Sequence, residues 1–280
     1  MREKKLMFGK YLDNVRSTAP VVHNITNYVT MNDVANILLA CGASPIMAND
    51  PCEVEEITAI CNGLNLNIGT LKQDTVQAML LAGKTARRLG RPVLLDPVGA
   101  GASRFRTETA GKIVNEVGPD VVRGNVTEIR MLAADDNALS RGVDANLTDA
   151  VTKENLRETV LRVKRQADRM GCILAVTGVT DLVTDGKICY CISNGRPEMR
   201  KITGTGCMLS GLMTAFLAAN PEHKLEAAAA AAAMMGVAGE IGWDHMARGD
   251  GNATYRNRII DAVYHMDGKS LDNGEKVSVL

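Results

Sequence analysis

The sequence predicts an α/β fold with a mostly parallel central sheet that is covered by helices on both faces. Three observations lead to this prediction: short apolar runs of strand length, longer helix-sized segments that alternate with them, and a polar or glycine-containing turn near the end of each apolar run. Repetition of strand, helix and strand is typical of parallel sheets, because each helix returns the chain to the starting edge of the sheet. A hydrophobic share of 46% in 280 residues can bury the core that such a fold needs.

The alternation is clearest in the first two thirds of the chain. The strand-sized apolar runs are 45–48, 93–95, 121–122 and 173–176. The helix-sized segments are 28–41, 72–89, 105–116 and 154–170. Since ligands of parallel α/β sheets bind beyond the carboxyl ends of the strands, the residues that follow each run are the first candidates for a functional site.

The last third predicts a hairpin followed by helices. Residues 182–188 carry Asp185-Gly186, a typical hairpin turn, which adds an antiparallel element to the sheet. Residues 207–220 predict a helix that Pro221 ends, and 222–243 predict another with seven consecutive alanines. Without an internal repeat or a linker-like segment, one domain spanning 1–280 is the simplest organisation.

Composition excludes several classes of function. Lys and Arg (32) balance Asp and Glu (32), which argues against a generally basic nucleic-acid-binding protein. No apolar stretch of membrane-spanning or signal-peptide length is evident, so we expect no membrane partner and a cytoplasmic location. Seven cysteines without framework spacing fit reduced thiols in a reducing compartment.

The sharpest candidate site is Gly204-Thr205-Gly206-Cys207, which leads directly into a predicted helix. Two glycines allow unusual backbone conformations, and the unpaired N–H groups of a helix start can bind an anion. The bound group could be a phosphoryl group or an acyl oxyanion. A glycine-rich turn beside a buried cysteine explains the same residues without any ligand, and the motif alone does not decide between these interpretations.

Three further groups of polar residues follow predicted strands. Asp96 ends an apolar run and opens the turn Pro97-Val98-Gly99, where its carboxylate could hold Mg²⁺. Arg123, Asn125 and Glu128 follow the next run, and Thr177-Gly178 follow a third. Each group also has a local explanation, as a turn or a helix start. Together, two carboxylates, an arginine and a glycine-rich helix start suit phosphoryl transfer, which depends mainly on alignment and charge neutralisation.

Seven segments of the chain together match one known family. They are, in order, His23-Asn24-Ile25-Thr26-Asn27, Gly42-Ala43-Ser44-Pro45-Ile46-Met47-Ala48, Asn67-Ile68-Gly69-Thr70-Leu71, Asp96-Pro97-Val98-Gly99-Ala100-Gly101, Arg123-Gly124-Asn125 with Glu128, Val176-Thr177-Gly178 and Gly204-Thr205-Gly206-Cys207. With these segments the chain resembles the hydroxyethylthiazole kinase family of thiamine salvage enzymes. The resemblance covers residues from about 12 to about 266, and Cys stands in the Gly-Thr-Gly-Cys motif where many other ribokinase-like kinases have Asp.

The resemblance implies a ribokinase-like three-layer αβα sandwich and phosphorylation of the primary alcohol of hydroxyethylthiazole by ATP and Mg²⁺. It assigns Asp96 and Glu128 to the metal, and Cys207, Gly204 and Gly206 to catalysis, with the thiol as a weak base or positioning group. The expected nucleotide contacts are Arg123, Thr177 and Asn125, and the expected thiazole contacts are Met47, Gly204, Asn27 and Gly69. The family is typically trimeric, so we expect a homotrimer with active sites between subunits.

The chain departs from the family pattern at Asp50-Pro51-Cys52, at Asn65-Leu66-Asn67 and at both ends. Residues 1–10 and 267–280 have no clear counterpart, and we expect flexible ends there. Three other functions stay open at this point: a kinase for another small alcohol such as hydroxymethylpyrimidine, a hydrolase or acyltransferase with Cys207 as nucleophile and His23 as base, and a ligand-binding protein without catalysis.

Overall fold

A computed structural model of the chain describes residues 6–133 and 155–280. Its centre is one sheet, in which the described residues form nine strands in the order β2-β1-β3-β4-β5-β6-β7-β8-β9. The first six strands in this order form five parallel pairs, whereas the pairs β6–β7, β7–β8 and β8–β9 are antiparallel. The strands are β1 (Val21–Ile25), β2 (Ser44–Met47), β3 (Gly63–Asn67), β4 (Val93–Asp96), β5 (Val121–Asn125), β6 (Ile173–Thr177), β7 (Asp181–Thr184), β8 (Cys189–Ile192) and β9 (Val277–Val279).

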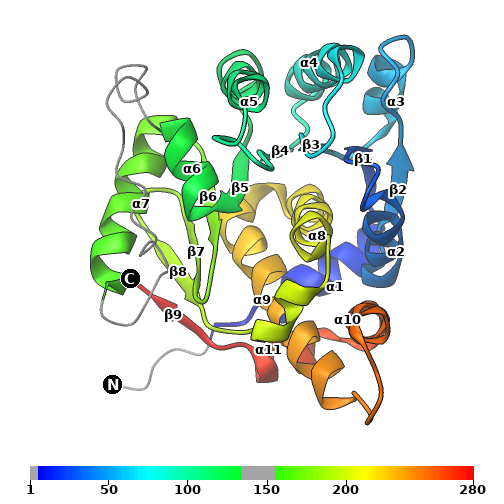
Figure 1. Cartoon of the computed structure of the whole chain (residues 1–280), viewed down its shortest axis with the longest axis vertical. Helices are drawn as coiled ribbons and strands as arrows, with labels where there is room; N and C mark the ends of the chain where they lie inside the picture. The colour runs from blue at the N-terminus through cyan, green and yellow to red at the C-terminus, as the bar shows by residue number, and fades with distance from the viewer. Residues whose placement is uncertain (1–5, 134–154) are drawn as a thin grey trace.

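Helices cover both faces of this sheet and give it three layers (Figure 1). On one face lie α3 (Val54–Ile60), α4 (Gln73–Arg88), α5 (Arg104–Val117), α6 (Val126–Ala133) and α7 (Leu156–Met170). On the other face lie α1 (Gly9–Thr18), α2 (Met31–Cys41), α8 (Thr205–Ala219), α9 (Lys224–Asp244), α10 (Asn252–His265) and α11 (Gly268–Gly274). The 3₁₀ helices η1 (Pro197–Lys201) and η2 (Pro221–His223) precede α8 and α9. The predicted α/β sandwich with a mostly parallel sheet is confirmed.

Two apolar cores, one on each face, hold the layers together. The larger core surrounds α8 and α9, and the seven alanines of α9 (227–233) are all buried. Small side chains allow this helix to approach its neighbours closely, as the alanine run predicts. Within the described part of the chain, 221–244 is the one helix long and apolar enough to cross a membrane by length and composition, and 78% of its most apolar window is buried inside the fold.

Most predicted elements form within a few residues of their expected bounds, and Pro221 indeed separates α8 from α9. The strand-sized apolar runs predicted from the sequence do not include β1 or β3. Both strands are fully buried or nearly so, yet they carry His23, Asn24, Asn65 and Asn67, which interrupt the apolar run. These side chains hydrogen-bond to one another or to neighbouring groups, so a strand forms where composition alone argues against one.

The C-terminal segment differs from the flexible end that we expected at 267–280. Helix α11 packs against α1 so closely that a Cβ at Gly9 would lie 2.2 Å from the carbonyl oxygen of Gly268. Strand β9 then pairs with β8 and becomes the edge of the sheet. At the other end of the chain, Phe8 is buried and α1 begins at Gly9, whereas 1–5 lie outside the described residues.

Candidate active site

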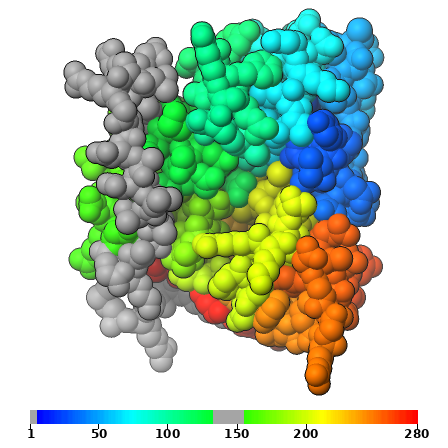
Figure 2. All heavy atoms as spheres, in the orientation of Figure 1, coloured from blue at the N-terminus to red at the C-terminus, as the bar shows by residue number. Residues whose placement is uncertain are grey.

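The carboxyl ends of the parallel strands and the start of α8 meet at one edge of the sheet. Asp96, Asn125 and Thr177 are the last residues of β4, β5 and β6, and Asn67 is the last of β3. Figure 2 shows the green part of the chain, which includes β5 and β6, the yellow part, which includes α8, and the dark blue part near β1 meeting on one face. Segments that are more than 100 residues apart in the sequence, such as Asp96 and Ser210, therefore come into direct contact.

Asp96 is a fully buried carboxylate at the centre of this edge. Its Oδ2 accepts hydrogen bonds from Asn67 Nδ2 (2.8 Å) and Ser210 Oγ (2.8 Å), and Arg123 Nη1 lies 3.4 Å away. Its Oδ1 is buried and has no partner among the described residues. Burial raises the pKa of Asp96, and the nearby Arg123 guanidinium opposes that shift.

Asn67 connects Asp96 to the segment after β1. Its Nδ2 donates to Asp96 Oδ2 and to Cys207 Sγ (3.2 Å), while its Oδ1 accepts from Asn27 Nδ2 (3.0 Å) and from the Gly69 N–H (2.9 Å). All four hydrogen-bonding positions of this buried amide are therefore used. Asn67 belongs to one of the motifs that match the family, but no role was predicted for it.

Cys207 lies in the first turn of α8, where two amide groups point at its sulfur. Asn27 Nδ2 and Asn67 Nδ2 each donate to Sγ at 3.2 Å, and the thiol is buried. Its own proton is consequently directed away from both amides. His23, the base that a cysteine nucleophile would have needed, is buried at another place with its ring nitrogens bonded to Thr58 and Ala48. This arrangement does not provide the Cys–His pair of a nucleophilic hydrolase.

The start of α8 has backbone amides without a side-chain cap. Gly204, the residue before the helix, has φ +89°, a conformation that glycine adopts without strain, and no side chain caps the helix. The first N–H groups of a helix have no carbonyl partner within it, and the helix dipole makes that end positive. The sequence predicts an anion site there, and these unpaired amides are the groups that would form it.

Arg123 lies directly against this helix start. A Cβ added at Gly206 would fall 2.6 Å from Arg123 Nη1, so only glycine leaves room for the guanidinium. The side chain also donates from Nη2 to Thr177 Oγ1 (2.9 Å). A cation beside the positive end of a helix is unfavourable unless negative charge is close, and Asp96 supplies one such charge. An anion bound between Arg123 and α8 would be stabilised by both.

Glu128 organises the two loops beside Asp96. Its Oε1 accepts the N–H of Gly99 (2.8 Å) and its Oε2 accepts the N–H of Asn125 (2.8 Å). In return the N–H of Glu128 donates to Asn125 Oδ1 (2.9 Å), a reciprocal pattern that caps α6. Glu128 therefore fixes the loop after β4 against the loop after β5, a contact that sequence spacing did not reveal.

The expected thiazole-contacting residues fall into two places. Asn27 adjoins both Gly69 and Cys207: a Cβ at Gly69 would lie 2.9 Å from that of Asn27, and Asn27 Nδ2 donates to Cys207 Sγ. Gly204 packs against Thr30, whose N–H and hydroxyl both bond to Asn27 Oδ1. Met47 is half-buried at the end of β2, the edge strand beside β1. A small molecule near Cys207 would thus be enclosed by residues from β1, β3 and α8.

A cavity of about 610 Å³ extends from Arg123 along the ends of β5 and β6. Asn125, Thr177 and Gly206 line it at the same end as Arg123, together with Asp181. Asp181 Oδ1 accepts the N–H of Gly178 (2.8 Å), and burial raises the pKa of this carboxyl to about 6. The opposite end is formed by the loop after β8 and by α9.

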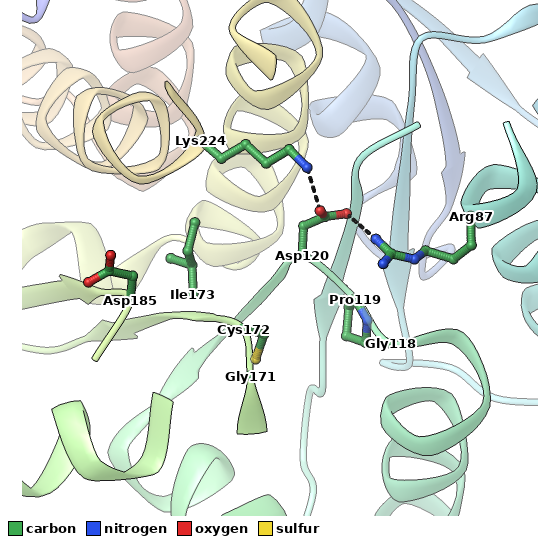
Figure 3. A pocket seen from close by; sticks show the side chains of 9 residues that line it. All are labelled: Arg87, Gly118, Pro119, Asp120, Gly171, Cys172, Ile173, Asp185 and Lys224. Atoms are coloured by element: carbon green, nitrogen blue, oxygen red, sulfur yellow. Dashed lines mark hydrogen bonds and ion pairs between the residues drawn. The ribbon is translucent and has the colours of Figure 1, made fainter. Parts of the chain in front are cut away.

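A second, smaller hollow of about 240 Å³ lies at the amino ends of β5 and β6 (Figure 3). There Asp120 bonds to Lys224 (2.6 Å), to Arg87 (3.1 Å) and to the N–H of Val93 (2.9 Å). Its carboxylate is already paired with two cations, which join α9 and α4 to β5. We interpret this cluster as structural.

This three-layer fold, with a glycine before the start of α8, a buried carboxylate beside it and a large cavity, is that of the ribokinase-like class of small-molecule kinases. The sequence model of the hydroxyethylthiazole kinase family matches residues 12–269. The chain belongs to the hydroxyethylthiazole kinase family. The resemblance seen in the sequence is thereby confirmed.

Individual relatives agree with this assignment. The chain is 49% identical to "Hydroxyethylthiazole kinase" of Clostridium acetobutylicum over 96% of its own length and 98% of that protein. It is 42% identical to the protein of the same name from Ruminiclostridium cellulolyticum, over 100% and 99% of the two chains. The solved structure of the hydroxyethylthiazole kinase protein from Pyrococcus horikoshii superposes with a TM-score of 0.85 at 33% identity, covering 98% of both chains.

More distant structures share the fold alone. The pyridoxal kinase from Staphylococcus aureus, solved in complex with ADP, matches with a TM-score of 0.59 at 16% identity, over 93% of this chain and 97% of that one. Two residues at the site were given no role from the sequence: Asn67 and Ser210. Of these, only Ser210 could have been predicted from the sequence. It lies one helical turn after Gly206 and therefore on the same face of α8.

Proposed function

We propose that the protein transfers the γ-phosphoryl group of ATP to the primary alcohol of hydroxyethylthiazole, a step of thiamine salvage. The observation that carries this proposal is the continuous hydrogen-bonded chain from Arg123 through Asp96 and Asn67 to Cys207, at the start of α8. One end of this chain lines the large cavity, and the other adjoins Asn27 and Gly69. A phosphoryl donor and an alcohol acceptor would therefore meet at the same helix start.

In this proposal the nucleotide occupies the cavity with its phosphates toward Arg123, Thr177 and Asn125. The guanidinium pairs with phosphate oxygens, and Thr177 holds the guanidinium through the bond to Nη2. The amides of α8 next to Gly204 and Gly206 receive the negative charge that develops on the transferred group. The thiazole lies against Met47, Asn27 and Gly69, with its hydroxyl near Cys207.

Asp96 and Glu128 suit a magnesium ion, which prefers carboxylate and water oxygens. Asp96 offers a buried oxygen, Oδ1, that has no partner among the described residues. Glu128 would act through water, since each of its oxygens already accepts a backbone N–H. When bound, the ion neutralises charge on the phosphate oxygens.

Cys207 acts in this proposal as a weak base or positioning group beside the alcohol. The amides of Asn27 and Asn67 hold its sulfur in place as an acceptor. Because the transition state of phosphoryl transfer is loose, removal of the hydroxyl proton contributes less than alignment of the reacting atoms. The thiol is therefore expected to assist turnover without being indispensable.

We further propose a cytoplasmic homotrimer, built as one domain, in which a neighbouring subunit completes the thiazole site. Tyr28 and Val29 follow Asn27 directly and are 68% and 60% exposed, although both are large and apolar. Strand β2, which carries Met47, is at the edge of the sheet. Apolar residues that are exposed beside a binding site favour an interface there. Light scattering coupled to size exclusion gives the mass that tests this assembly.

The activity is tested by incubating the protein with ATP, Mg²⁺ and hydroxyethylthiazole and searching for the phosphate monoester by mass spectrometry. Hydroxymethylpyrimidine and pyridoxal serve as competing alcohols in the same assay. Preferential phosphorylation of hydroxyethylthiazole supports the proposal. If ADP is released only with another alcohol, that alcohol is the acceptor and hydroxyethylthiazole is not. Turnover without ATP would show that the protein is not a kinase.

A further inference from the structure

The end of the large cavity remote from Arg123 has a wall made by the loop after β8. Ser193, Asn194, Gly195 and Arg196 line the cavity there and face Met235 and other residues of α9. If the phosphates lie at Arg123, this wall adjoins the nucleoside part of the nucleotide. The position of the loop then decides how well that part is enclosed.

This loop is held from behind by the C-terminal segment. The N–H of Ser193 donates to the carbonyl of Lys276 (2.9 Å), and the N–H of Lys276 donates to Asn194 Oδ1 (2.6 Å). Asn194 Nδ2 in turn donates to the carbonyl of Gly274 (2.9 Å). The side chain of Asn194 thus binds the backbone on both sides of residue 275, immediately before β9 begins.

Glu240 of α9 bonds both to the loop after β8 and to the C-terminal segment. Its Oε1 accepts the N–H of Gly195 (2.9 Å) and Asn194 Nδ2 (3.3 Å), and its Oε2 pairs with Lys276 Nζ (2.9 Å). One carboxylate therefore connects the cavity loop, α9 and the C-terminal segment. We call Asn194, Glu240 and Lys276 the C-terminal clasp.

The loop has little freedom to approach α9 more closely. A Cβ at Gly236 would lie 2.5 Å from Asn194 Cβ, so the two backbones are already in close contact. Gly195 has φ +117°, a conformation open to glycine but costly for other residues. Loss of the clasp can consequently move the loop only away from α9, which would widen the cavity.

We propose that the C-terminal clasp is a positioning device for the nucleotide, which sets the affinity for the nucleoside part and leaves the phosphate end unchanged. This inference rests on the proposed function, in which the cavity takes ATP. The family match ends at residue 269, so 274–276 lie beyond the part of the chain that it covers. The clasp adds to the family pattern a role for a segment that the sequence left unassigned.

The test uses the full chain with Asn194→Ala and Glu240→Ala, and a chain ending at Glu275. Each change removes three hydrogen bonds or ion pairs of the clasp, and the shortened chain also lacks β9. A net effect of the size of one or two hydrogen bonds corresponds to roughly a tenfold change in binding. We expect the KM for ATP and the Kd for ADP to rise about tenfold. The kcat at saturating ATP and the KM for the thiazole alcohol should stay within about twofold, because neither depends on the clasp. Glu222→Ala, an exposed glutamate before the other end of α9, is the matched control and should change none of these values.

Inorganic tripolyphosphate distinguishes a loss of nucleoside positioning from a general destabilisation of the binding site. It offers the phosphates without the nucleoside, so its inhibition constant should be the same in the wild type and the clasp variants. Equal losses for ATP and tripolyphosphate, or an unchanged KM for ATP, would overturn the inference. A wild-type protein that forms no phosphate ester from ATP would instead overturn the proposed function.

Discussion

The side-chain amide of Asn67 lies between the carboxylate of Asp96 and the sulfur of Cys207, donating to the first at 2.8 Å and to the second at 3.2 Å. These are the two residues around which the reaction is proposed to occur. Since its carbonyl oxygen holds Asn27 and Gly69 at the same time, one amide fixes four groups of the site. Asn67 therefore connects the part of the site proposed to hold the phosphates with the part proposed to hold the alcohol.

Replacement of Asn67 is expected to reduce kcat rather than substrate binding. Asn67→Ala leaves Asp96 and Cys207 without their shared donor, and kcat should fall about 10- to 100-fold, the range of a misaligned reacting geometry. The KM for ATP should change little, because Arg123 and Thr177 stay in place. Steady-state kinetics with both substrates varied measure kcat and the two KM values separately. Asn67→Asp, which removes the donors and adds a second carboxylate beside Asp96, should be worse than Asn67→Ala, and a milder effect of Asp would contradict the role of the donors.

Cys207→Ala should lower kcat by about 10- to 100-fold while measurable turnover survives, since base catalysis adds little to a loose transition state. Cys207→Asp, which supplies a permanent carboxylate, should remain active. Asp96→Ala should be more damaging than Cys207→Ala, because it removes the partner of Arg123, Ser210 and Asn67 together. Rates at saturating Mg²⁺ give the order of the three variants. Complete loss of activity in correctly folded Cys207→Ala would refute this account of the thiol.

Gly206→Ala is expected to weaken nucleotide binding through Arg123. The added methyl group would lie 2.6 Å from Nη1 and must displace the guanidinium from the start of α8. We expect the KM for ATP to rise by about tenfold, corresponding to the loss of one charge-assisted hydrogen bond. Gly111→Ala on α5 is the matched control, as its Cβ meets no atom within 4 Å. That control should gain about 0.5–1 kcal/mol in the free energy of unfolding and keep the wild-type KM.

The sequence predicted the layers of the fold and the end of the sheet that carries the site, because strand-sized apolar runs followed by polar residues are a local signal. Asp96, Arg123, Thr177 and Gly206 indeed lie together. Strands β1 and β3 escaped prediction because their buried asparagines bond to partners that are distant in the sequence. Such pairings depend on the tertiary structure and leave no pattern in a single chain.

The contacts of Glu128 and of the C-terminal segment escaped prediction for a related reason. Glu128 was a candidate metal ligand because it follows a predicted strand closely. Its bonds to Gly99 and Asn125, however, depend on how two loops meet. Residues 274–276 have a composition typical of a chain end, and their order comes from Asn194 and Glu240. The resemblance seen in the sequence gave no information about this segment, because it ended at about residue 266, and the family model ends at 269.

Asp181 predicts a pH dependence of stability that one substitution should remove. Burial raises the pKa of this carboxyl to about 6 from 3.8, so the folded protein binds its proton more tightly than the unfolded chain. The stabilisation that this proton provides is complete below pH of about 4 and is lost as the pH rises through about 6. Asp181→Asn keeps an oxygen that can accept the N–H of Gly178, and it carries no charge at any pH.

The melting temperature of Asp181→Asn, relative to wild type, should therefore be higher at pH 8 than at pH 5, by about 2 °C or more. Calorimetry at both values without nucleotide measures the difference, and Asp185→Asn serves as the control. Backbone N–H groups outweigh the burial of Asp185 and lower the pKa of its carboxyl, so this group is ionised in the folded and unfolded chain at both pH values. Its removal should therefore change the melting temperature by the same amount at pH 5 and at pH 8. An advantage of Asp181→Asn that is the same at both pH values would show that the carboxyl ionises normally in the fold, and that the cavity beside Arg123 is as accessible to water as the surface.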